Sequence, residues 1–599
     1  MAAPSARERK WNSAEAAPPA FTAQFPEYPR PIAELLYHRG VRTQDAIDEF
    51  FGAEYAHDIH DPYLFIDMEK AVERILRAVR NKEKITIYGD YDADGVSGSV
   101  VLMGALSALG ADADVYIPDR FHEGYGLNRA ALERVMAGGA RMIITVDCGI
   151  TDTEEIAYAR TQGIDVIVVD HHLVPEVPPP AYAILNPKHP DEQYPFKYLC
   201  ATGVAFKLAC ALLASDDARA CGIRDGFEKW LLDIVAIGSV ADMVPLVGEN
   251  RTLVKYGLIV LAKTQRLGLR KLLALENGRA RGLPKRDGSG KAPITSETIA
   301  FSLAPRINAT SRMGHATTSF NLLVSEDETE AEQLAQTVEG LNNERRRAVD
   351  KILKEAETMI AEETAREGVF PAVLVLGKDE WPAGVVGLVS GRLTERYGRP
   401  SFVYGRTNDH LKGSCRGIGE FHVVEAMQFC QKQDPELLLD LGGHPMAGGF
   451  SLVPEKAAAL KELLTAYGSK KLAGNVLQPI TAVDAEITPD EISWELFDWL
   501  LRFEPFGEGN RKPVFLMRGC EVYSARSVGK KEDHLKITLR APLKNGTLKL
   551  LHGIGFGLSE NGMRHCEKGE KVDIVFELEA NEWNGTRELQ LKVKDLRPV

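Results

Sequence analysis

The fold is decided by one stretch, Ile85-Thr86-Ile87-Tyr88-Gly89, which runs directly into Asp90-Tyr91-Asp92-Ala93-Asp94-Gly95. Three further apolar runs end in the same way: residues 142–146 before Asp147, 166–169 before Asp170-His171-His172, and 234–240 before Asp242. Short runs rich in Val and Ile are typical of strands buried on both faces of a parallel sheet, and ligands bind beyond the carboxyl ends of such strands. We therefore expect a doubly wound α/β domain with carboxylates and imidazoles along one edge.

Carboxylates held so close together repel one another unless cations lie among them. The set contains imidazole but no thiolate, which suits Mn²⁺ or Mg²⁺ better than structural zinc. It also has more ligands than one ion needs. Two ions about 3.5–4 Å apart, sharing a bridging carboxylate, would hold the attacking and leaving oxygens of a phosphoryl displacement. The pattern thus predicts a two-metal phosphoesterase that uses two Mn²⁺ or Mg²⁺ ions.

Each part of this pattern has a simpler interpretation. Asp147 or Asp242 alone could be a helix N-cap or a turn residue, and adjacent histidines can be an accident of a loop. The D-x-D-x-D-G run from Asp90 could begin a calcium loop, but Val101 stands where such a loop needs a glutamate, and the run follows a strand rather than a helix. Four clusters after four apolar runs are difficult to attribute to chance.

Several motifs resemble those of a known family. Four segments resemble the motifs of the DHH phosphoesterase superfamily: Tyr88-Gly89-Asp90-Tyr91-Asp92-Ala93-Asp94-Gly95, Val146-Asp147-Cys148-Gly149, Asp170-His171-His172 and Ser239-Val240-Ala241-Asp242. The RecJ family of single-stranded-DNA-specific 5′→3′ exonucleases is further matched by Pro305-Arg306-Ile307-Asn308-Ala309 with Arg312-Met313-Gly314, Lys412-Gly413-Ser414-Cys415-Arg416, and Gly442-Gly443-His444-Pro445-Met446-Ala447-Gly448-Gly449. The resemblance implies hydrolysis of single strands to 5′-mononucleotides in DNA repair and recombination.

The resemblance also implies a metal-ligand set. Its members are Asp90, Asp92, Asp94, Asp147, His171 and Asp242, with Asp92 and Asp147 at one ion and Asp94, Asp147, His171 and Asp242 at the other. Asp147 would be the bridge. Asp90 would complete the first site or order its water, because Tyr88 stands where many DHH enzymes have a metal-binding histidine. His172 would contact the phosphate or the leaving oxygen, and its alternative role is to orient a neighbouring ligand.

Cleavage polarity requires recognition of a terminal 5′ phosphate, whose oxygens suit guanidinium and hydroxyl donors. In the resemblance this phosphate is held by Arg120, Arg306, Ser414 and Arg416, although any one arginine could form only a surface ion pair. Further substrate contacts are implied for Asn308, Arg312, Gly443 and His444. The His444 imidazole would face the scissile phosphate, which makes Asp90, His172 and His444 the implied catalytic residues.

Composition is ordinary and decides little. The chain has 599 residues and a net charge of −13, but residues 511–599 carry 17 Lys and Arg against 12 Asp and Glu, so a locally basic surface is compatible with DNA binding. No segment has the apolar length of a membrane span. The eight cysteines include no C-x-x-C pair, which predicts neither a zinc site nor a disulfide framework and favours a reducing, cytoplasmic location.

Five segments are expected along the chain. They are an N-terminal segment at 1–68, the DHH catalytic domain at 69–263, a helical connector at 264–369 with a long helix at 327–366, a smaller α/β DHH-associated domain at 370–470, and an OB-like domain at 471–599. The tail has short apolar runs at 513–518, 521–526, 534–540, 547–556, 571–579 and 589–593, which is typical of a small antiparallel barrel. Phe506, Tyr523 and Trp583 could stack bases there or lie in its core.

The implied substrate is single-stranded DNA with a 5′ phosphate. A single-strand-binding protein and a RecQ-type helicase are the implied protein partners of a monomeric enzyme that does not enter membranes. Two other classes remain open. One is a DHH phosphodiesterase of short oligonucleotides or cyclic dinucleotides, which generally lacks such a tail. The other is a non-catalytic DNA-binding relative, against which the complete ligand set argues.

Overall fold

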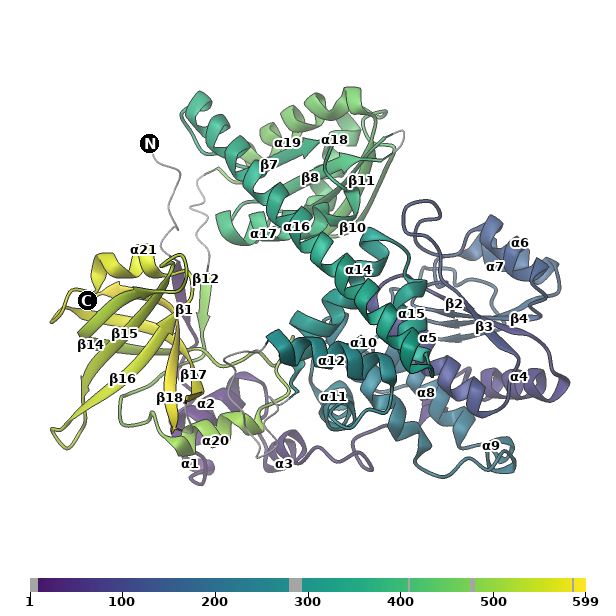
Figure 1. Ribbon diagram of the computed structural model, residues 1–599, viewed down its shortest axis with the longest axis horizontal. Helices are drawn as coiled ribbons and strands as arrows, with labels where there is room; N and C mark the ends of the chain where they lie inside the picture. Colours follow the sequence, from purple (N-terminus) through teal and green to yellow (C-terminus); the bar gives the residue numbers. More distant parts are fainter. Residues whose placement is uncertain (1–8, 280–293, 408–409, 474–479, 584–585) are drawn as a thin grey trace. The chain divides into compact units, whose positions relative to one another are not determined.

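A computed structural model describes residues 9–279, 294–407, 410–473, 480–583 and 586–599 (Figure 1). The chain divides into two compact units. The first contains Asn342–Val483 together with the N-terminal strand, and the second contains Ala14–Leu341 and Asp484–Val599. None of the described helices has the length and apolarity to cross a membrane. The five segment boundaries expected from the sequence remain a prediction.

The expected parallel sheet is present in the second unit. Its order is β3 (Ala113–Tyr116), β2 (Ile85–Gly89), β4 (Met142–Val146), β5 (Asp165–Val169) and β6 (Ala183–Leu185), with every pairing parallel. Because β3 and β4 lie on opposite sides of β2, the chain reverses direction across the sheet at β2 and β4. Such a switch point opens a crevice at the carboxyl ends of the two strands. Asp90 and Asp147 follow those ends.

Helices cover both faces of this sheet, which confirms the doubly wound class (Figure 1). Ile144 and Val146 pack with α5 (Ala93–Ala108) and α8 (Ala201–Leu213), while Ile143 packs with α6 (Arg129–Ala137) and α7 (Thr153–Thr161). Helix α4 spans Met68–Asn81 and α9 spans Asp216–Ala220. Helix α5 begins directly after Asp92, because the Asp92 side chain accepts from the Asp94 and Gly95 amides and caps the helix there.

The fourth apolar run is not a strand. Residues Leu232–Ala241 form helix α10. Its side chains are buried on every side of the helix except near its C-terminal end, and Asp242 follows its last turn. An apolar run of this length cannot be assigned to strand or helix by periodicity alone when every side is buried. The expectation of four strand ends was therefore wrong for this one, although the carboxylate still reaches the same edge.

A helical region follows. It contains α11 (Gly248–Leu261), α12 (Leu267–Arg279), α13 (Ser296–Thr298), the π-turn η3 (Ile299–Leu303), α14 (Ala304–Met313) and α15 (Thr317–Val324). The long helix α16 covers Glu328–Glu367 and continues into the first unit. Its bounds differ from the expected 327–366 by one residue at each end.

The first unit has its own sheet, in the order β10 (Asp440–His444), β11 (Ala447–Leu452), β9 (Leu411–Arg416), β8 (Ser401–Arg406) and β7 (Leu374–Lys378). Only β7 and β8 are parallel. Helices α17 (Val386–Tyr397), α18 (Val423–Gln433) and α19 (Ala457–Lys471) accompany it. The smaller α/β domain is confirmed.

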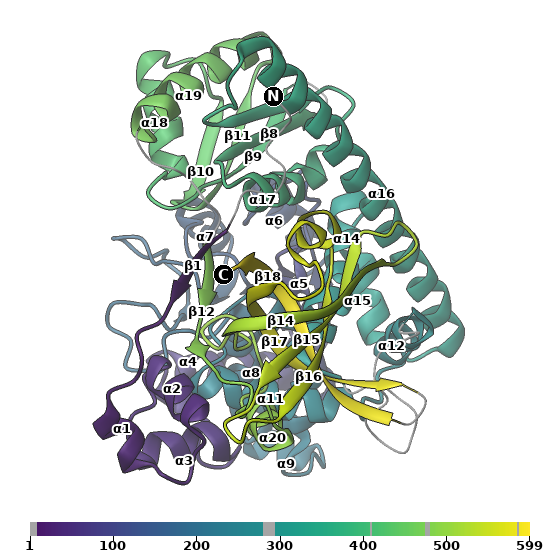
Figure 2. The same ribbon diagram turned by 90° about the vertical axis from the view of Figure 1, so that its left-hand side faces the viewer.

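The tail forms the expected barrel, which five strands close (Figure 2). It is not wholly antiparallel as predicted, because residues 552–554 pair in parallel with residues 590–592. Strand β14 (Phe515–Val528) pairs with both β15 (His534–Pro542) and β17 (Lys571–Trp583), and β16 (Leu548–Gly555) and β18 (Thr586–Pro598) complete the circuit. The two strands expected at 513–518 and 521–526 are one, because bulges bend β14 between its two partners. Tyr523 is 45% exposed, Phe506 is partly buried against the core, and the Trp583 side chain lies outside the described residues.

The N-terminal residues, which carried no recognisable chemistry, complete the barrel's core. Helices α1 (Pro19–Gln24), α2 (Arg30–His38), α3 (Gln44–Gly52) and α20 (Trp494–Arg502) contribute to one apolar cluster with the strands. Strand β1 (Lys10–Ser13) pairs in parallel with β12 (Ile480–Val483), and both strands belong to the first unit (Figure 2). Arg251 of α11 donates to the main-chain oxygens of Phe50 and of residues 502–504, which ties the barrel to the catalytic domain.

Candidate active site

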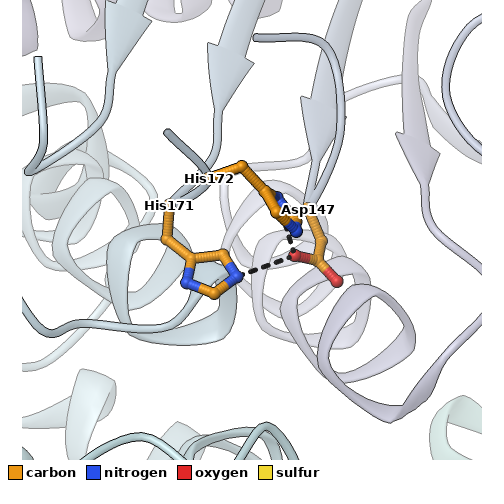
Figure 3. A group of neighbouring side chains, drawn as sticks. All are labelled: Asp147, His171 and His172. Carbon is orange, nitrogen blue, oxygen red and sulfur yellow. Dashed lines mark ion pairs between the residues drawn. The ribbon is translucent and has the colours of Figure 1, made fainter. Parts of the chain in front are cut away.

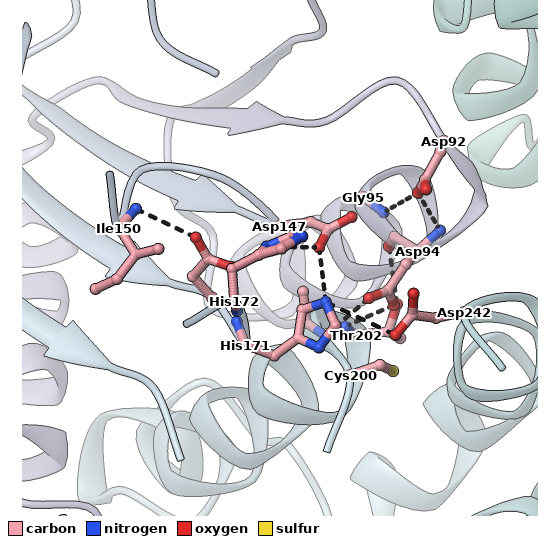
Figure 4. Close-up of polar contacts among 12 residues, drawn as sticks. Asp92, Asp94, Gly95, Asp147, Ile150, His171, His172, Cys200, Thr202 and Asp242 are labelled. Atoms are coloured by element: carbon pink, nitrogen blue, oxygen red, sulfur yellow. Dashed lines mark hydrogen bonds and ion pairs between the residues drawn. The ribbon is translucent and has the colours of Figure 1, made fainter. Parts of the chain in front are cut away.

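The carboxylates and histidines singled out in the sequence converge at one end of the parallel sheet (Figure 4). Three groups of ligand atoms each lie within 4.8 Å of one another: Asp90, Asp92 and Asp147 form one, Asp94, His171 and Asp242 the second, and Asp147, His171 and His172 the third. The first two groups correspond to the two ion sites expected from the sequence, and the third links them. His171 Nε2 lies 3.3 Å from Asp147 Oδ1 and 3.7 Å from Asp242 Oδ2, so it stands between the two sets. Asp90, Asp94 and Asp147 are buried.

Helix capping accounts for part of this geometry, but at Asp92 and Asp94 rather than at Asp147 or Asp242, for which it was considered. Besides the cap that Asp92 supplies to α5, the two Asp94 oxygens accept from the amides of Ala201 and Thr202, at 2.8 and 3.0 Å, where α8 begins. A carboxylate oxygen has two lone pairs, so these bonds orient the groups and leave them able to bind a cation. Capping and metal binding are therefore compatible here.

The backbone of Asp147 is in the left-handed region, with φ of 63°. Such a conformation is costly for a residue other than glycine and persists only where the surroundings hold it. The Tyr125 hydroxyl donates to the Asp147 main-chain oxygen at 3.0 Å and lies 3.3 Å from His172 Nδ1. Sequence reasoning missed Tyr125, because it comes from a loop after β3 that no motif marks.

Asp170 is the second residue whose role was missed. It is fully buried, and its Oδ1 accepts from the amides of His171 and His172 and from His172 Nδ1, the last at 2.7 Å. His172 Nδ1 lies 3.9 Å from Asp147 Oδ1, and the His172 side chain is 39% exposed (Figure 3). Asp170 therefore fixes the ring of His172 and leaves its Nε2 for another partner. The quoted Asp-His-His motif was the available signal for this role.

The electrostatics of the site favour a bound cation. Burial, followed by the charges of neighbouring aspartates, raises the pKa of Asp90 and Asp147 well above the usual value and that of Asp242 to about 9. Burial lowers the pKa of His171, which keeps its imidazole neutral, as a metal ligand must be. Buried oxygens of Asp90 and Asp147 have no hydrogen-bond partner among the described residues. Oxygen and imidazole donors of this kind fit Mn²⁺ or Mg²⁺.

These shifts predict a pH-dependent stabilisation by metal. Without metal, the folded protein binds more protons at Asp242 than the unfolded chain does. The contribution of protonated Asp242 to the folding stability is therefore fully present below about pH 4 and is lost as pH rises through about 9. Cations replace the protons, and the rise in Tm on adding Mn²⁺ should be larger at about pH 8 than at about pH 6. Thermal unfolding at both pH values measures it. A larger rise at the lower pH would contradict the assignment.

Three of the expected substrate contacts surround the Asp90 loop. The Arg120 guanidinium lies 4.8 Å from the centre of the Tyr91 ring. Burial raises the pKa of the Tyr91 hydroxyl, and the charge of Arg312 is near enough to lower it. Asn308 Oδ1 accepts from the Ala93 amide at 2.9 Å. Arg306 instead is fully buried, and its Nε donates to Glu339 at 2.7 Å. Its contact with a phosphate stays a prediction that this position does not favour.

The remaining expected contacts lie together on the sheet of the first unit. Ala447 of β11 is in register with both Arg416 of β9 and His444 of β10, and Gly448 is in register with Gly443. Arg416 Nη1 donates to the Ser414 hydroxyl at 3.1 Å, and burial lowers the Arg416 pKa. No carboxylate pairs with Arg416 among the described residues. A guanidinium and a hydroxyl without a counterion are suited to a phosphate.

Three family models match this chain. They describe the DHH family N-terminal domain over residues 84–239, the DHHA1 domain over 369–470 and the RecJ OB domain over 483–595. The single-stranded-DNA-specific exonuclease RecJ of Bacillus subtilis is 37% identical over 566 residues, covering 94% of this chain and 67% of the relative. The protein of the same name from Escherichia coli is 32% identical over 594 residues, covering 96% and 98%.

Solved structures agree. RecJ from Thermus thermophilus in complex with Mn²⁺ superposes with a TM-score of 0.77 at 29% identity, covering 99% of this chain and 80% of that one. The structure of the same protein with Mg²⁺ gives 0.72 at 27% identity, covering 99% and 79%. From these matches along nearly its whole length, the chain belongs to the RecJ family.

Proposed function

We propose that this protein is a metal-dependent exonuclease that hydrolyses single-stranded DNA from the 5′ end and releases 5′-mononucleotides. The observation that carries the proposal is the pair of ligand sets, Asp90/Asp92/Asp147 and Asp94/His171/Asp242, at the switch point of the parallel sheet. Family membership supports the substrate, because the relatives are named for action on single-stranded DNA. The cofactors are two Mn²⁺ or Mg²⁺ ions, the ions in the solved relatives.

The roles of the chain's own residues follow from their positions. When bound, the ions acidify a water molecule and neutralise charge that develops on the phosphate. Asp147 belongs to the first ligand set and its Oδ1 lies 3.3 Å from His171 Nε2 of the second, which suits a bridging role, and Tyr125 holds its backbone. Asp90 completes the first set. His172, fixed through Nδ1 by Asp170, presents Nε2 as a proton donor to the phosphate or the leaving oxygen.

Polarity depends on the phosphate ligands. We assign the 5′ phosphate to Arg120, Ser414 and Arg416, with Gly443 and His444 near it, because each arginine lies beside other residues of the family motifs. Asn308 and Arg312 contact the strand next to the Asp90 loop. Arg306 is proposed as the residue that anchors α14 rather than as a phosphate ligand.

The anchoring role of Arg306 predicts a loss of stability. Arg306→Ala leaves the Glu339 carboxylate, which is 12% exposed, without this partner, and breaking such a buried pair costs about 3–5 kcal/mol. Urea unfolding should show an earlier transition. The matched control is Arg366→Ala, which removes an exposed arginine paired with Glu367 and should leave the transition close to that of the parent. Equal stabilities of Arg306→Ala and the parent would exclude the anchoring role.

A substrate panel tests the proposed function. The purified protein with Mn²⁺ would be given 5′-phosphorylated single strands, blunt duplexes, dinucleotides and cyclic dinucleotides. Rapid digestion of single strands with little action on duplexes is expected. Cleavage of dinucleotides or cyclic dinucleotides alone would favour the compact phosphodiesterase class. Binding of single strands without cleavage, in protein shown to hold its ions, would favour a non-catalytic relative.

The protein partners remain proposals. A single-strand-binding protein and a RecQ-type helicase would each supply an accessible 5′-ended strand. We also propose a monomer and a cytoplasmic location, the latter supported by eight cysteines without a disulfide framework.

A further inference from the structure

Accessible residues form a stripe along the helical segment that leads to the Asp90 loop. The segment runs through η3 and α14, and Phe301, Pro305, Asn308 and Arg312 are accessible within it while most of their neighbours are buried. Their spacing of i, i+4, i+7 and i+11 puts them along one side of a helix. Phe301 is 74% exposed, among the most exposed of the large apolar side chains described. In the same stripe, Asn308 contributes an amide and Arg312 a guanidinium.

The presentation of Phe301 has a cause in the sequence. Pro305 has no amide hydrogen, and its ring crowds the carbonyl four residues earlier, which is that of Phe301. The helix widens there into the π-turn, in which the Ala304 amide donates to Ile299. Ile299, Ser302 and Leu303 of this turn are buried. The aromatic ring is therefore held on an anchored turn, and such turns are frequent at functional sites.

Both ends of the segment contact elements that bear on the substrate. Towards its end, Asn308 bonds to the Ala93 amide, between two of the metal-ligand aspartates. At its start, the Ser296 hydroxyl donates to the Phe506 oxygen at 2.5 Å, and Glu297 lies 3.9 Å from Lys512, in the stretch that enters the barrel. Phe301 is seven residues before Asn308, about 10 Å along a helix axis. It thus lies between the barrel's entry segment and the catalytic loop.

We infer that Phe301 is a stacking site for an unpaired nucleobase of the single strand, on the path between the barrel and the metal centre. This inference rests on the proposed function. A flat ring next to an amide and a guanidinium matches a base with its phosphate, since aromatic side chains stack bases of any sequence while cations follow the backbone. A protein partner would instead require an apolar centre around Phe301, whereas the stripe positions beyond Pro305, Asn308 and Arg312, are polar.

Single strands of graded length test the site. Phe301→Ala should raise KM for long strands about ten-fold, within the range for loss of one base stack, and should leave dinucleotide cleavage unchanged. Phe301→Trp should behave as the parent. The matched control is Trp230→Ala, since Trp230 is 52% exposed but lies just before α10, at the end opposite Asp242. It should also behave as the parent.

Fluorescence gives a second readout. In an Asp147→Ala background, which prevents digestion, 2-aminopurine placed at successive positions should be quenched at one position, and Phe301→Ala should abolish that quenching. A parent that digests single strands while Phe301→Ala matches it in KM and quenching would overturn the stacking site alone. A parent that does not digest single strands would overturn the proposed function itself.

Discussion

Asp147→Ala is expected to lower the rate of phosphodiester hydrolysis by about a thousandfold or more. Asp147 is the carboxylate that we propose as the bridge between both ions, and metal ions supply several kcal/mol of charge stabilisation in the transition state. The fold should survive, because relief of repulsion among the neighbouring aspartates offsets the lost contacts. Steady-state rates with Mn²⁺ and the circular dichroism spectrum measure the two effects.

The adjacent histidines provide the control for this prediction. His171→Ala removes a proposed ligand and should reduce metal content as well as rate, whereas His172→Ala should reduce the rate and retain the ions. Metal content is measured by elemental analysis of dialysed protein. Near-parental turnover by Asp147→Ala would exclude a bridging role, and equal metal loss in the two histidine variants would exclude the separate role of His172.

Arg416→Ala is expected to remove most of the preference for a 5′-phosphorylated over a 5′-hydroxyl strand. A charge-assisted hydrogen bond contributes roughly 1.5–3 kcal/mol, so the preference should fall by about 10- to 150-fold. Rates on 5′-hydroxyl strands should change little, because the metal ligands are untouched. Competition between the two substrates, each carrying a different fluorophore, measures the ratio directly.

Arg406→Ala is the matched control for Arg416. Arg406 ends a neighbouring strand of the same sheet, is 44% exposed and pairs with Asp379, so its removal takes away the same charge without touching Ser414. Its preference for the 5′ phosphate should equal that of the parent. If Arg416→Ala keeps the full preference, the phosphate is held elsewhere.

The candidate metal site could be predicted from the sequence because most of its residues follow their strands directly along the chain. Each buried strand runs directly into its polar side chains, and parallel pairing then brings Asp90 and Asp147 to one edge. Helix α10 was mistaken for a strand, because an apolar run that is buried all round has no periodicity to read. Its carboxylate was still correctly expected at the site.

Tertiary contacts account for what was missed. Tyr125 acts through bonds to Asp147 and His172, which other elements supply, and the burial of Arg306 depends on Glu339, thirty-three residues later. Asp170 instead bonds to His172, two residues later, so its motif did carry the signal for its role. The barrel also differs from its sequence pattern. Its core includes Phe21, Leu35 and Phe50 from the N-terminal helices, so a truncation before Pro513 would leave these side chains exposed rather than remove a separate module.

Metal-dependent digestion from the 5′ end is tested most directly by a time course on a single strand that carries one label at its 5′ end and another at its 3′ end, with Mn²⁺ present or chelated. We predict that 5′ label appears first as mononucleotide, that the 3′ label stays in long fragments until late, and that chelation stops both. Early release of the 3′ label, or equal digestion without metal, would contradict this function.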